Sequence, residues 1–232
     1  MNGNAILALC LAALSASSAT AAERMLSVTT FDKVRIDGPY SVRLTTGVSP
    51  FAKISGSSAA IDSVSVDQQG RTLIVRGNPS SWGGNYPGQS RGPVEISVGT
   101  QDLAAAYVNG PGSLQVNRVK GLSFDLSVQG SGSASIAEVR VDHMKVSISG
   151  VGTASIAGSS PKLTALVRGT SALDASQLAV KDATVGAEGP AQVRITASNS
   201  AKVDARGVSS VEVAGGGACT VKAQGSAVVT GC

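Results

Sequence analysis

Apolar and polar residues alternate along much of the chain, most clearly between residues 122 and 129, where the sequence reads Leu-Ser-Phe-Asp-Leu-Ser-Val-Gln. Alternation with a period of two is typical of a β-strand that buries one face and exposes the other. The even-numbered positions of this run, from Leu122 to Val128, are therefore expected to face inward. We predict that the following side chains are buried: Phe124, Leu126, Val128, Val146 and Ile148.

The strand pattern is part of a repeat. The segment at 108–116 reads Val-Asn-Gly-Pro-Gly-Ser-Leu-Gln-Val, and related segments follow at the same spacing, at 128–136 and 148–156. A fixed period of this size is typical of stacked repeat architectures, and the Gly-x-Gly pairs allow tight corners. We predict an all-β fold, a parallel β-helix (β-solenoid) with coils of about 20 residues over 101–232. The spacing is less regular after Ile156, so the later coil boundaries stay open.

Charged residues support the same register. If coils stack with a step of 20, residues i and i+20 face each other at about 4.8 Å, where opposite charges attract and like charges repel. The opposite pairs at this step are Arg118/Glu138, Asp125/Lys145, Asp142/Lys162, Lys162/Asp182, Asp182/Lys202, Arg168/Glu188 and Asp174/Arg194. From residue 101 onward the like pairs are Lys120/Arg140 and Lys202/Lys222.

The part before residue 101 is strand-like but less regular. Apolar residues alternate with polar ones at 31–36 and 40–44, on either side of a turn at Asp37-Gly38-Pro39, and shorter apolar runs follow at 52–54, 64–66 and 73–75. We predict that residues 23–100 form N-terminal cap strands that cover the open end of the solenoid. Residues 23–232 are then one domain.

Residues 1–22 have the pattern of a signal peptide. A mostly apolar run at 5–14 is too short to span a bilayer, and small residues follow at the positions that a signal peptidase reads. We therefore predict secretion across a bacterial inner membrane to a periplasmic or extracellular location. The mature chain then contains no transmembrane segment.

Two cysteines remain once the signal peptide is removed. Cys219 and Cys232 are an even pair in an oxidising compartment, so a disulfide is favoured over two buried thiols. The chain is 42% hydrophobic but only 3% aromatic, and its net charge is +4. Because the basic residues are scattered, the sequence does not indicate nucleic-acid binding.

Candidate chemistry is sparse. His143 is the sole histidine, and the sequence predicts no catalytic residue, no cofactor and no metal site. Asp142 and Asp182 fall on one face in the 20-residue register, with Lys162 between them. That pair carries the alternative hypothesis, a β-helical polysaccharide lyase or hydrolase.

A Gly- and Pro-rich segment at 77–93 interrupts the strands. It contains Trp82, Tyr86 and Arg91, whose side chains are suited to stacking on a sugar or gripping an anion. We predict a ligand site at these three residues, with a disordered spacer as the competing interpretation.

The opening Phe31-Asp-x-Val34-x-Ile36-x-Gly38, followed by the repeated Val-x-Gly-x-Gly-x-Ala-x-Ile unit, resembles the family of putative auto-transporter adhesins with a head GIN domain. The resemblance implies a secreted bacterial β-solenoid, and no catalytic residue can be carried over from it. We expect a non-enzymatic cell-envelope binding or structural module, adhesin-like, whose partner is a cell-surface glycan or protein.

Overall fold

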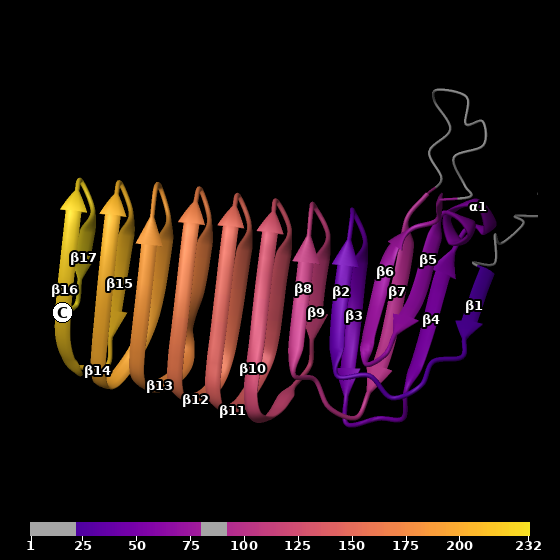
Figure 1. Ribbon diagram of the computed structural model, residues 1–232, viewed down its shortest axis with the longest axis horizontal. Helices are drawn as coiled ribbons and strands as arrows, with labels where there is room; N and C mark the ends of the chain where they lie inside the picture. Colours follow the sequence, from indigo (N-terminus) through magenta and orange to yellow (C-terminus); the bar gives the residue numbers. More distant parts are fainter. Residues whose placement is uncertain (1–21, 80–91) are drawn as a thin grey trace, which may run out of the picture.

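The computed structural model describes residues 22–79 and 92–232, and this part of the chain is nearly all β. Strands make up 73% of the structure and helix 3%, and the coils stack in parallel into a solenoid of about 6 turns. Figure 1 shows the resulting rod, with successive coils side by side along its length. The predicted fold class is confirmed.

The N-terminal third contains seven strands and one short helix. They are β1 (Ala22–Leu26), β2 (Lys33–Asp37), β3 (Ser41–Thr46), β4 (Phe51–Gly56), α1 (Ser58–Asp62), β5 (Val64–Gln69), β6 (Thr72–Gly77) and β7 (Val94–Thr100). The pairings β1–β4, β4–β7 and β5–β6 are antiparallel, whereas β2 and β3 pair in parallel with later strands.

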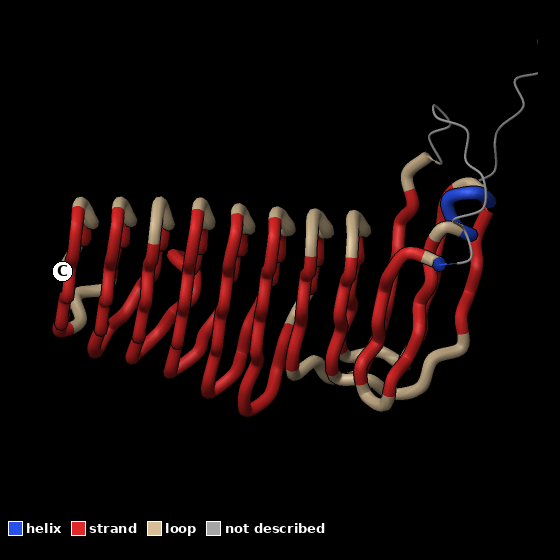
Figure 2. The backbone as a smooth tube through the Cα atoms, turned by 45° about the horizontal axis from the view of Figure 1, so that its top comes forward, coloured by secondary structure: helices blue, strands red, loops and turns tan. Residues whose placement is uncertain are grey.

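The remaining strands form the regular coils. They are β8 (Ala105–Asn109), β9 (Ser113–Val116), β10 (Val119–Gly130), β11 (Ser133–Gly150), β12 (Thr153–Gly169), β13 (Ala172–Glu188), β14 (Gln192–Gly207), β15 (Ser210–Ala214), β16 (Ala218–Gly225) and β17 (Val228–Thr230). The tube in Figure 2 shows that the long strands bend around the rod, so each contributes to more than one side.

Two broad sides result. Face A contains β6, β2 and β8, the C-terminal parts of β10 to β14, and β16. Face B contains β7, β3 and β9, the N-terminal parts of β11 to β14, and then β15 and β17. A short third side joins them through the middle of the long strands, for example at 139–141.

The first coil comes from far upstream in the sequence. Val34 of β2 pairs with Ala106, and Val42 of β3 pairs with Leu114, so β2 and β3, with the corner between them, stack directly on the coil of β8 and β9. The segment from β4 to β7 lies between them in sequence and packs at the N-terminal end (Figure 1).

The coil step is 20 residues over most of the rod, but it is 19 on face A between β11 and β12 and 18 in the last coils. Val128 pairs with Ile148, but Ile148 pairs with Val167, so the difference in residue number falls from 20 to 19. Between Val203 and its partner Val221 the difference is 18. The register shifts between Ile136 and Val139, at a corner of the coil. The strands pair normally on both sides of this corner, so the missing residue is taken out of the corner itself.

This shortening corrects part of the predicted charge register. The pairings Asp125/Lys145, Lys162/Asp182, Arg168/Glu188, Asp174/Arg194 and Lys120/Arg140 are confirmed, and Arg118 lies 4.0 Å from Glu138. Three pairings are wrong: Lys162 lies beside His143 rather than Asp142, Asp182 beside Ser200 rather than Lys202, and Lys222 beside Asp204 rather than Lys202.

The core is a stack of aliphatic side chains between the faces. All five side chains that were predicted to be buried have exposed fractions of 2% or less. Leu122 is different: it is 77% exposed, although it continues the alternation. The chain bends at Gly121, and residue 122 has no partner between the pairs Gly121/Val141 and Ser123/His143, so its side chain points outward.

Glycines make the corner between faces A and B narrow. Gly130 has a φ of +94°, and a Cβ there would lie 3.2 Å from Cα of Gly110 in the coil before. A Cβ on Gly132 would lie 2.8 Å from the carbonyl oxygen of Gly110, closer than a side chain can pack. Stacked glycines therefore let successive corners approach at the strand spacing.

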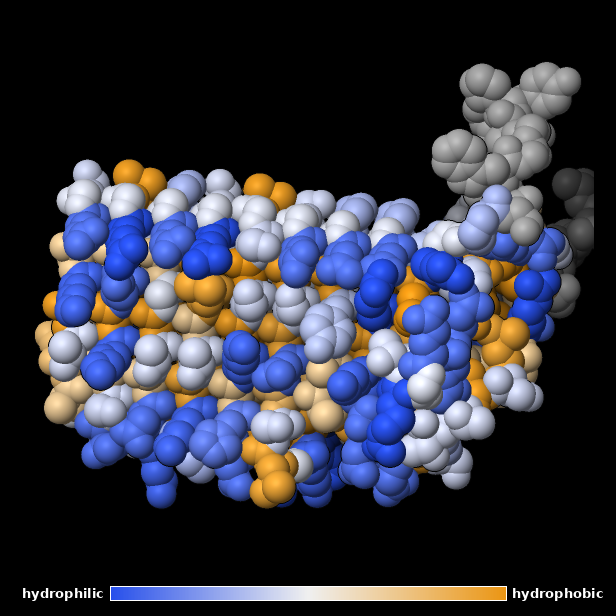
Figure 3. Space-filling model, viewed as in Figure 1, coloured by the Kyte–Doolittle hydropathy of each residue, from blue (hydrophilic) through white to orange (hydrophobic). Residues whose placement is uncertain are grey.

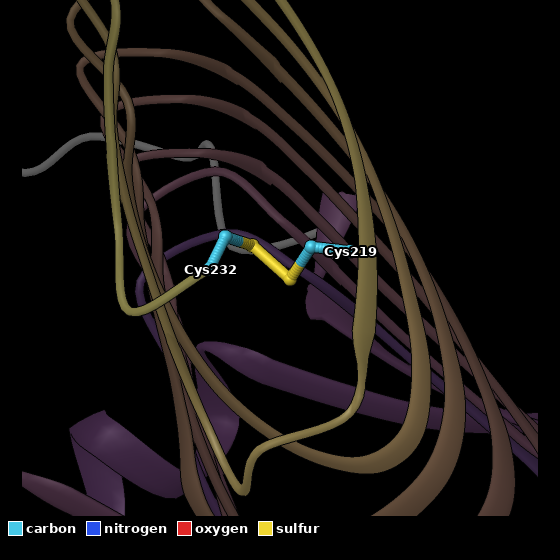
Figure 4. The surroundings of a disulfide bond; sticks show 2 residues. All are labelled: Cys219 and Cys232. Atoms are coloured by element: carbon cyan, nitrogen blue, oxygen red, sulfur yellow. A yellow bond between two sulfur atoms is a disulfide. The ribbon is translucent and has the colours of Figure 1, made fainter.

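The predicted disulfide is confirmed. Cys219 of β16 and Cys232, just beyond β17, are joined with their Cα atoms 5.5 Å apart. Figure 4 shows the bridge crossing the inside of the last coil from one wall to the other. It therefore closes the C-terminal coil across the end of the core.

Leu126→Asp is expected to unfold the protein, because it places an unpaired carboxylate in the aliphatic stack at a cost of more than about 4 kcal/mol. Ser127→Asp is the matched control, since residue 127 points outward on the same strand. Thermal melting by circular dichroism measures both. A folded Leu126→Asp protein with an unchanged melting temperature would contradict the buried stack.

Removing the disulfide with Cys219→Ser and Cys232→Ser is expected to destabilise the last coil by about 3 kcal/mol, the loop-closure value for a loop of this size. Because a solenoid is held by contacts between neighbouring coils, the effect should be local. Hydrogen exchange should show lost protection in β16 and β17 and retained protection in β12. Equal loss along the whole rod would contradict this local role.

Candidate functional site

Face B carries two rows of outward side chains that run along the rod. The first row is Glu95, Ser41, Ser113, Ser133, Thr153, Ala172, Gln192, Ser210 and Val228. The second row is Ser97, Arg43, Gln115, Ser135, Ser155, Asp174, Arg194, Glu212 and Thr230. Neighbours within a row belong to neighbouring strands, about 4.8 Å apart.

The middle of these rows is hollow. A groove of about 340 Å³ runs over β9, β11, β12, β13 and β14, and we call it the hydroxyl groove. Its outward lining residues are Ser113, Gln115, Ser133, Ser135, Thr153, Ser155, Ala172, Asp174, Gln192 and Arg194. The groove exists because small side chains occupy its centre, whereas glutamine and arginine stand at its ends.

The central hydroxyl groups are available to a ligand. Ser133, Ser135, Thr153 and Ser155 are exposed, and none of their side chains hydrogen-bonds to another described residue. Among the serine and threonine residues that line the groove, only Ser113, at its N-terminal side, hydrogen-bonds within the described chain. Its hydroxyl group donates to Oγ of Ser41 at 3.0 Å. The centre is a two-by-two array of free donors and acceptors on a rigid sheet.

Charged residues close the far end of the groove. Oδ1 of Asp174 accepts hydrogen bonds from Oγ of Ser176 at 2.6 Å and from its backbone N–H at 3.1 Å. These bonds lower the pKa of Asp174, and the positive charge of Arg194 lowers it further. Nε of Arg194 lies 3.4 Å from Oε2 of Glu212. Arg194 therefore serves two carboxylates, Asp174 and Glu212, and the three groups together carry one negative charge.

Arg43 stands at the other end. It lines a small hollow of about 30 Å³ together with Ser41, Glu95 and Gln115, and Gln115 also lines the hydroxyl groove. The polar strip is therefore continuous from β7 to β14. Five strand steps separate Arg43 from Arg194, a length of about 24 Å.

Face A is organised differently. Its charged side chains pair with one another, with Nε of Arg168 2.9 Å from Oε2 of Glu188 and Nε of Arg206 2.9 Å from Oδ1 of Asp204. Figure 3 shows this side of the rod, with hydrophilic side chains spread across it. A smaller hollow of about 170 Å³ lies among Thr184, Lys202 and Thr220. Face B offers the larger groove and the freer hydroxyl groups.

The residues considered for catalysis do not assemble. Asp142 and Asp182 do not share a row, because the 19-residue step between β11 and β12 places His143 beside Lys162, which in turn faces Asp182. Hydrogen bonds from Ser200 and Asn199 lower the pKa of Asp182, the opposite of what a general acid needs. Within residues 22–79 and 92–232, no three His, Cys, Asp or Glu residues cluster as metal ligands.

The predicted ligand residues Trp82, Tyr86 and Arg91 lie outside the described residues. The hydroxyl groove was not among the predicted sites. Its signal was present in the repeats, where Ser-Ala-Ser at 133–135 and Thr-Ala-Ser at 153–155 occupy the same position. The groove also depends on residues from less regular coils, which the repeat alone did not place.

Fold and groove together define a class: a β-solenoid that presents a long polar groove on one face. The chain belongs to the family described as putative auto-transporter adhesin, head GIN domain, which matches residues 30–217. This confirms the resemblance in the sequence. No curated protein matches the chain in sequence.

Solved structures share the fold. A putative adhesin from Bacteroides fragilis NCTC 9343 has a TM-score of 0.79 at 18% identity, over 91% of this chain and 96% of its own. A putative lipid binding protein from Parabacteroides distasonis ATCC 8503 has a TM-score of 0.70 at 13% identity, over 91% and 96%. A putative adhesin from Parabacteroides merdae ATCC 43184 has a TM-score of 0.66 at 17% identity, over 91% and 95%.

None of the helical segments in the described chain is long and apolar enough to cross a membrane. The described helix, α1, has five residues and belongs to the N-terminal end of the rod.

Ser176→Ala is expected to raise the pKa of Asp174 toward the ordinary aspartate value, because Ser176 supplies the largest part of the lowering. A carboxylate with a lowered pKa stabilises the fold above the ordinary pKa and loses that contribution as the pH falls through the lowered value. Titration of the Asp174 carboxyl carbon by NMR measures the shift. Ser135→Ala, in the same row, is the control and should leave it unchanged; no shift in Ser176→Ala would contradict the hydrogen bonds.

Proposed function

We propose that the protein is a non-enzymatic, adhesin-like binding module that holds a linear glycan along the hydroxyl groove of face B. The observation that carries the proposal is the array of free hydroxyl groups at Ser133, Ser135, Thr153 and Ser155 on the floor of an elongated groove. Membership in an adhesin family supports a binding role.

The chemistry of the groove fits sugar hydroxyl groups. Serine and threonine each donate one hydrogen bond and accept two, so they match a surface whose polar groups are also hydroxyls. Each such bond contributes about 0.5–1.5 kcal/mol net. A polymer that repeats along the groove can add these small contributions over several strands, which a single sugar cannot.

The charges favour a neutral polymer at the centre of the groove. No charged side chain stands among the four central hydroxyl residues, and Asp174, Arg194 and Glu212 at one end together carry one negative charge, which disfavours an anionic polymer. A protein partner is the second possibility that the sequence leaves. It is less favoured here, because protein interfaces depend on buried aromatic or other apolar anchors, and the lining of the groove contains no aromatic side chain.

Trp82, Tyr86 and Arg91 stay a separate proposal. Rings at 82 and 86 can stack on sugar faces, and the guanidinium group of Arg91 can hold a carboxylate or phosphate. They would add a second contact to the same class of ligand. The alternative of a polysaccharide-active enzyme gains no support, because the aspartates on which it depended fall in different rows.

We also propose that the chain acts at a cell surface or in the periplasm, with residues 1–22 as the cleaved signal peptide. An adhesin family is consistent with a secreted or cell-surface protein, and an oxidised Cys219–Cys232 pair fits an oxidising compartment.

Ser135→Arg is expected to lower the affinity for a linear glycan by at least about tenfold, because a long cationic side chain fills the groove and removes a hydroxyl group. Ser147→Arg is the matched control, since it makes the same change at an outward position of face A on the same strand. Binding to an array of bacterial and plant glycans measures the effect, and thermal melting verifies the fold of both variants.

Equal binding by both arginine variants would contradict the proposal that the glycan binds in the hydroxyl groove. The double variant Trp82→Ala with Tyr86→Ala tests the other contact. Lost binding with an unchanged melting temperature supports a site there, and unchanged binding removes it.

A further inference from the structure

The C-terminal end of the rod leaves its core uncovered. Val203 is 2% exposed and its neighbours in β14 are buried, whereas Val221, which pairs with it one coil further on, is 40% exposed. Ala223 is also exposed, and Cys219 and Val229 are only half-buried, although all of them occupy inward positions. The Cys219–Cys232 bridge ties the two walls of this last coil together (Figure 4), but Val221 in the same coil stays exposed.

The same end presents two open sheet edges. β16 pairs with β14 on one side, and β17 pairs with β15, and within the described chain neither has a strand on its other side. Unpaired backbone N–H and C=O groups at an edge are a template for another strand. The N-terminal end is different, because α1 packs there with Ala60 and Ile61 buried.

We propose that the C-terminal end is an interface with a second copy of this chain, related by a two-fold axis perpendicular to faces A and B. A rotation of 180° about that axis keeps each face in its own layer and reverses the strand direction. β16 then pairs antiparallel with β16 of the partner, and β17 with β17. Because the N-terminal end is covered by α1, a head-to-tail filament is disfavoured and the contact closes as a dimer.

Charge selects the register of the β16 pairing. Inward residues must face inward residues, so the axis passes through a residue and not between two. Centred on Lys222, the pairing would oppose two lysines directly. Centred on Val221, it places Lys222 opposite the partner's Thr220 and Cys219 opposite the partner's Ala223. The Val221 register avoids the lysine pair of the Lys222 register and centres the contact on the exposed Val221.

The β17 edge can pair about the same two-fold axis as the β16 edge. Val221 and Val229 are each four residues from Gly225, which forms the corner between the faces, so they stand at similar heights on opposite walls. An axis through Val221 and Val229 centres the β17 pairing on Val229. That register places Val228 opposite the partner's Thr230, a pair of β-branched residues that suits neighbouring antiparallel strands. One operation thus satisfies both sheets.

The association is independent of the groove, and it would set two hydroxyl grooves in line along one double-length rod. A polymer that spans both would be held by two sites at once, which raises avidity without any new contact. The proposed function can fail while the dimer stands, and the reverse also holds.

The test is the mass of the secreted chain, measured by sedimentation velocity over a range of concentrations, with charge variants at the edge. The wild type should show a concentration-dependent mass of two chains. Thr220→Lys should raise the dimer dissociation constant by about tenfold, because it creates two lysine pairs per dimer. Thr220→Glu should lower it, and Lys222→Glu added to Thr220→Lys should restore it.

Thr184→Lys is the matched control, because residues 184 and 220 both lie beside Lys202 on face A but only residue 220 is at the edge. It should leave the dissociation constant unchanged. A wild type that stays a single chain at its highest soluble concentration overturns the proposal. Equal weakening by Thr184→Lys and Thr220→Lys also overturns it, because the contact would then not depend on the edge.

Discussion

The stacking of each coil on the one before it determines nearly every other feature of the molecule. Backbone groups pair in parallel, and apolar side chains lie over one another in columns, such as Val108, Val128, Ile148 and Val167. The corner glycines lie over one another as well, because a Cβ at Gly130 would press on Gly110. A shift of one residue would turn the aliphatic face outward, so the core fixes which side chains form the rows on the surface.

Those rows give the two faces different chemistry. On face A, carboxylates and guanidinium groups in nearby positions neutralise one another, as Arg168 does with Glu188. On face B, small hydroxyl residues occupy three consecutive coils and leave a hollow, with the charged groups of Asp174, Arg194 and Glu212 at one end. The same stacking therefore yields one face whose charged groups form ion pairs with one another, and a second face whose hydroxyl groups remain free to bind a partner. It also leaves the last coil with half of its contacts.

The sequence predicted the fold, the buried face and the disulfide because each follows from a local pattern: alternation, a 20-residue repeat and an isolated cysteine pair. It did not predict the shorter steps of the later coils, since residues removed at a corner leave the strand pattern intact. For this reason Asp142 does not lie in the same row as Asp182, although a uniform step of 20 residues predicted that it would. The early coil could have been found, because Asp37-Gly38-Pro39 matches Asn109-Gly110-Pro111. The groove depends on side-chain size across five strands, which no single repeat contains.

The most direct test of the central claim, that face B is the binding surface, is to map backbone amide shifts by NMR while a linear oligosaccharide that binds the chain is titrated in. The claim predicts that the perturbed amides cluster at residues 113–115, 133–135 and 153–155, and that those of the same strands on face A, such as residues 145–149, stay unchanged. Perturbations confined to face A, or to residues 80–91, would contradict it.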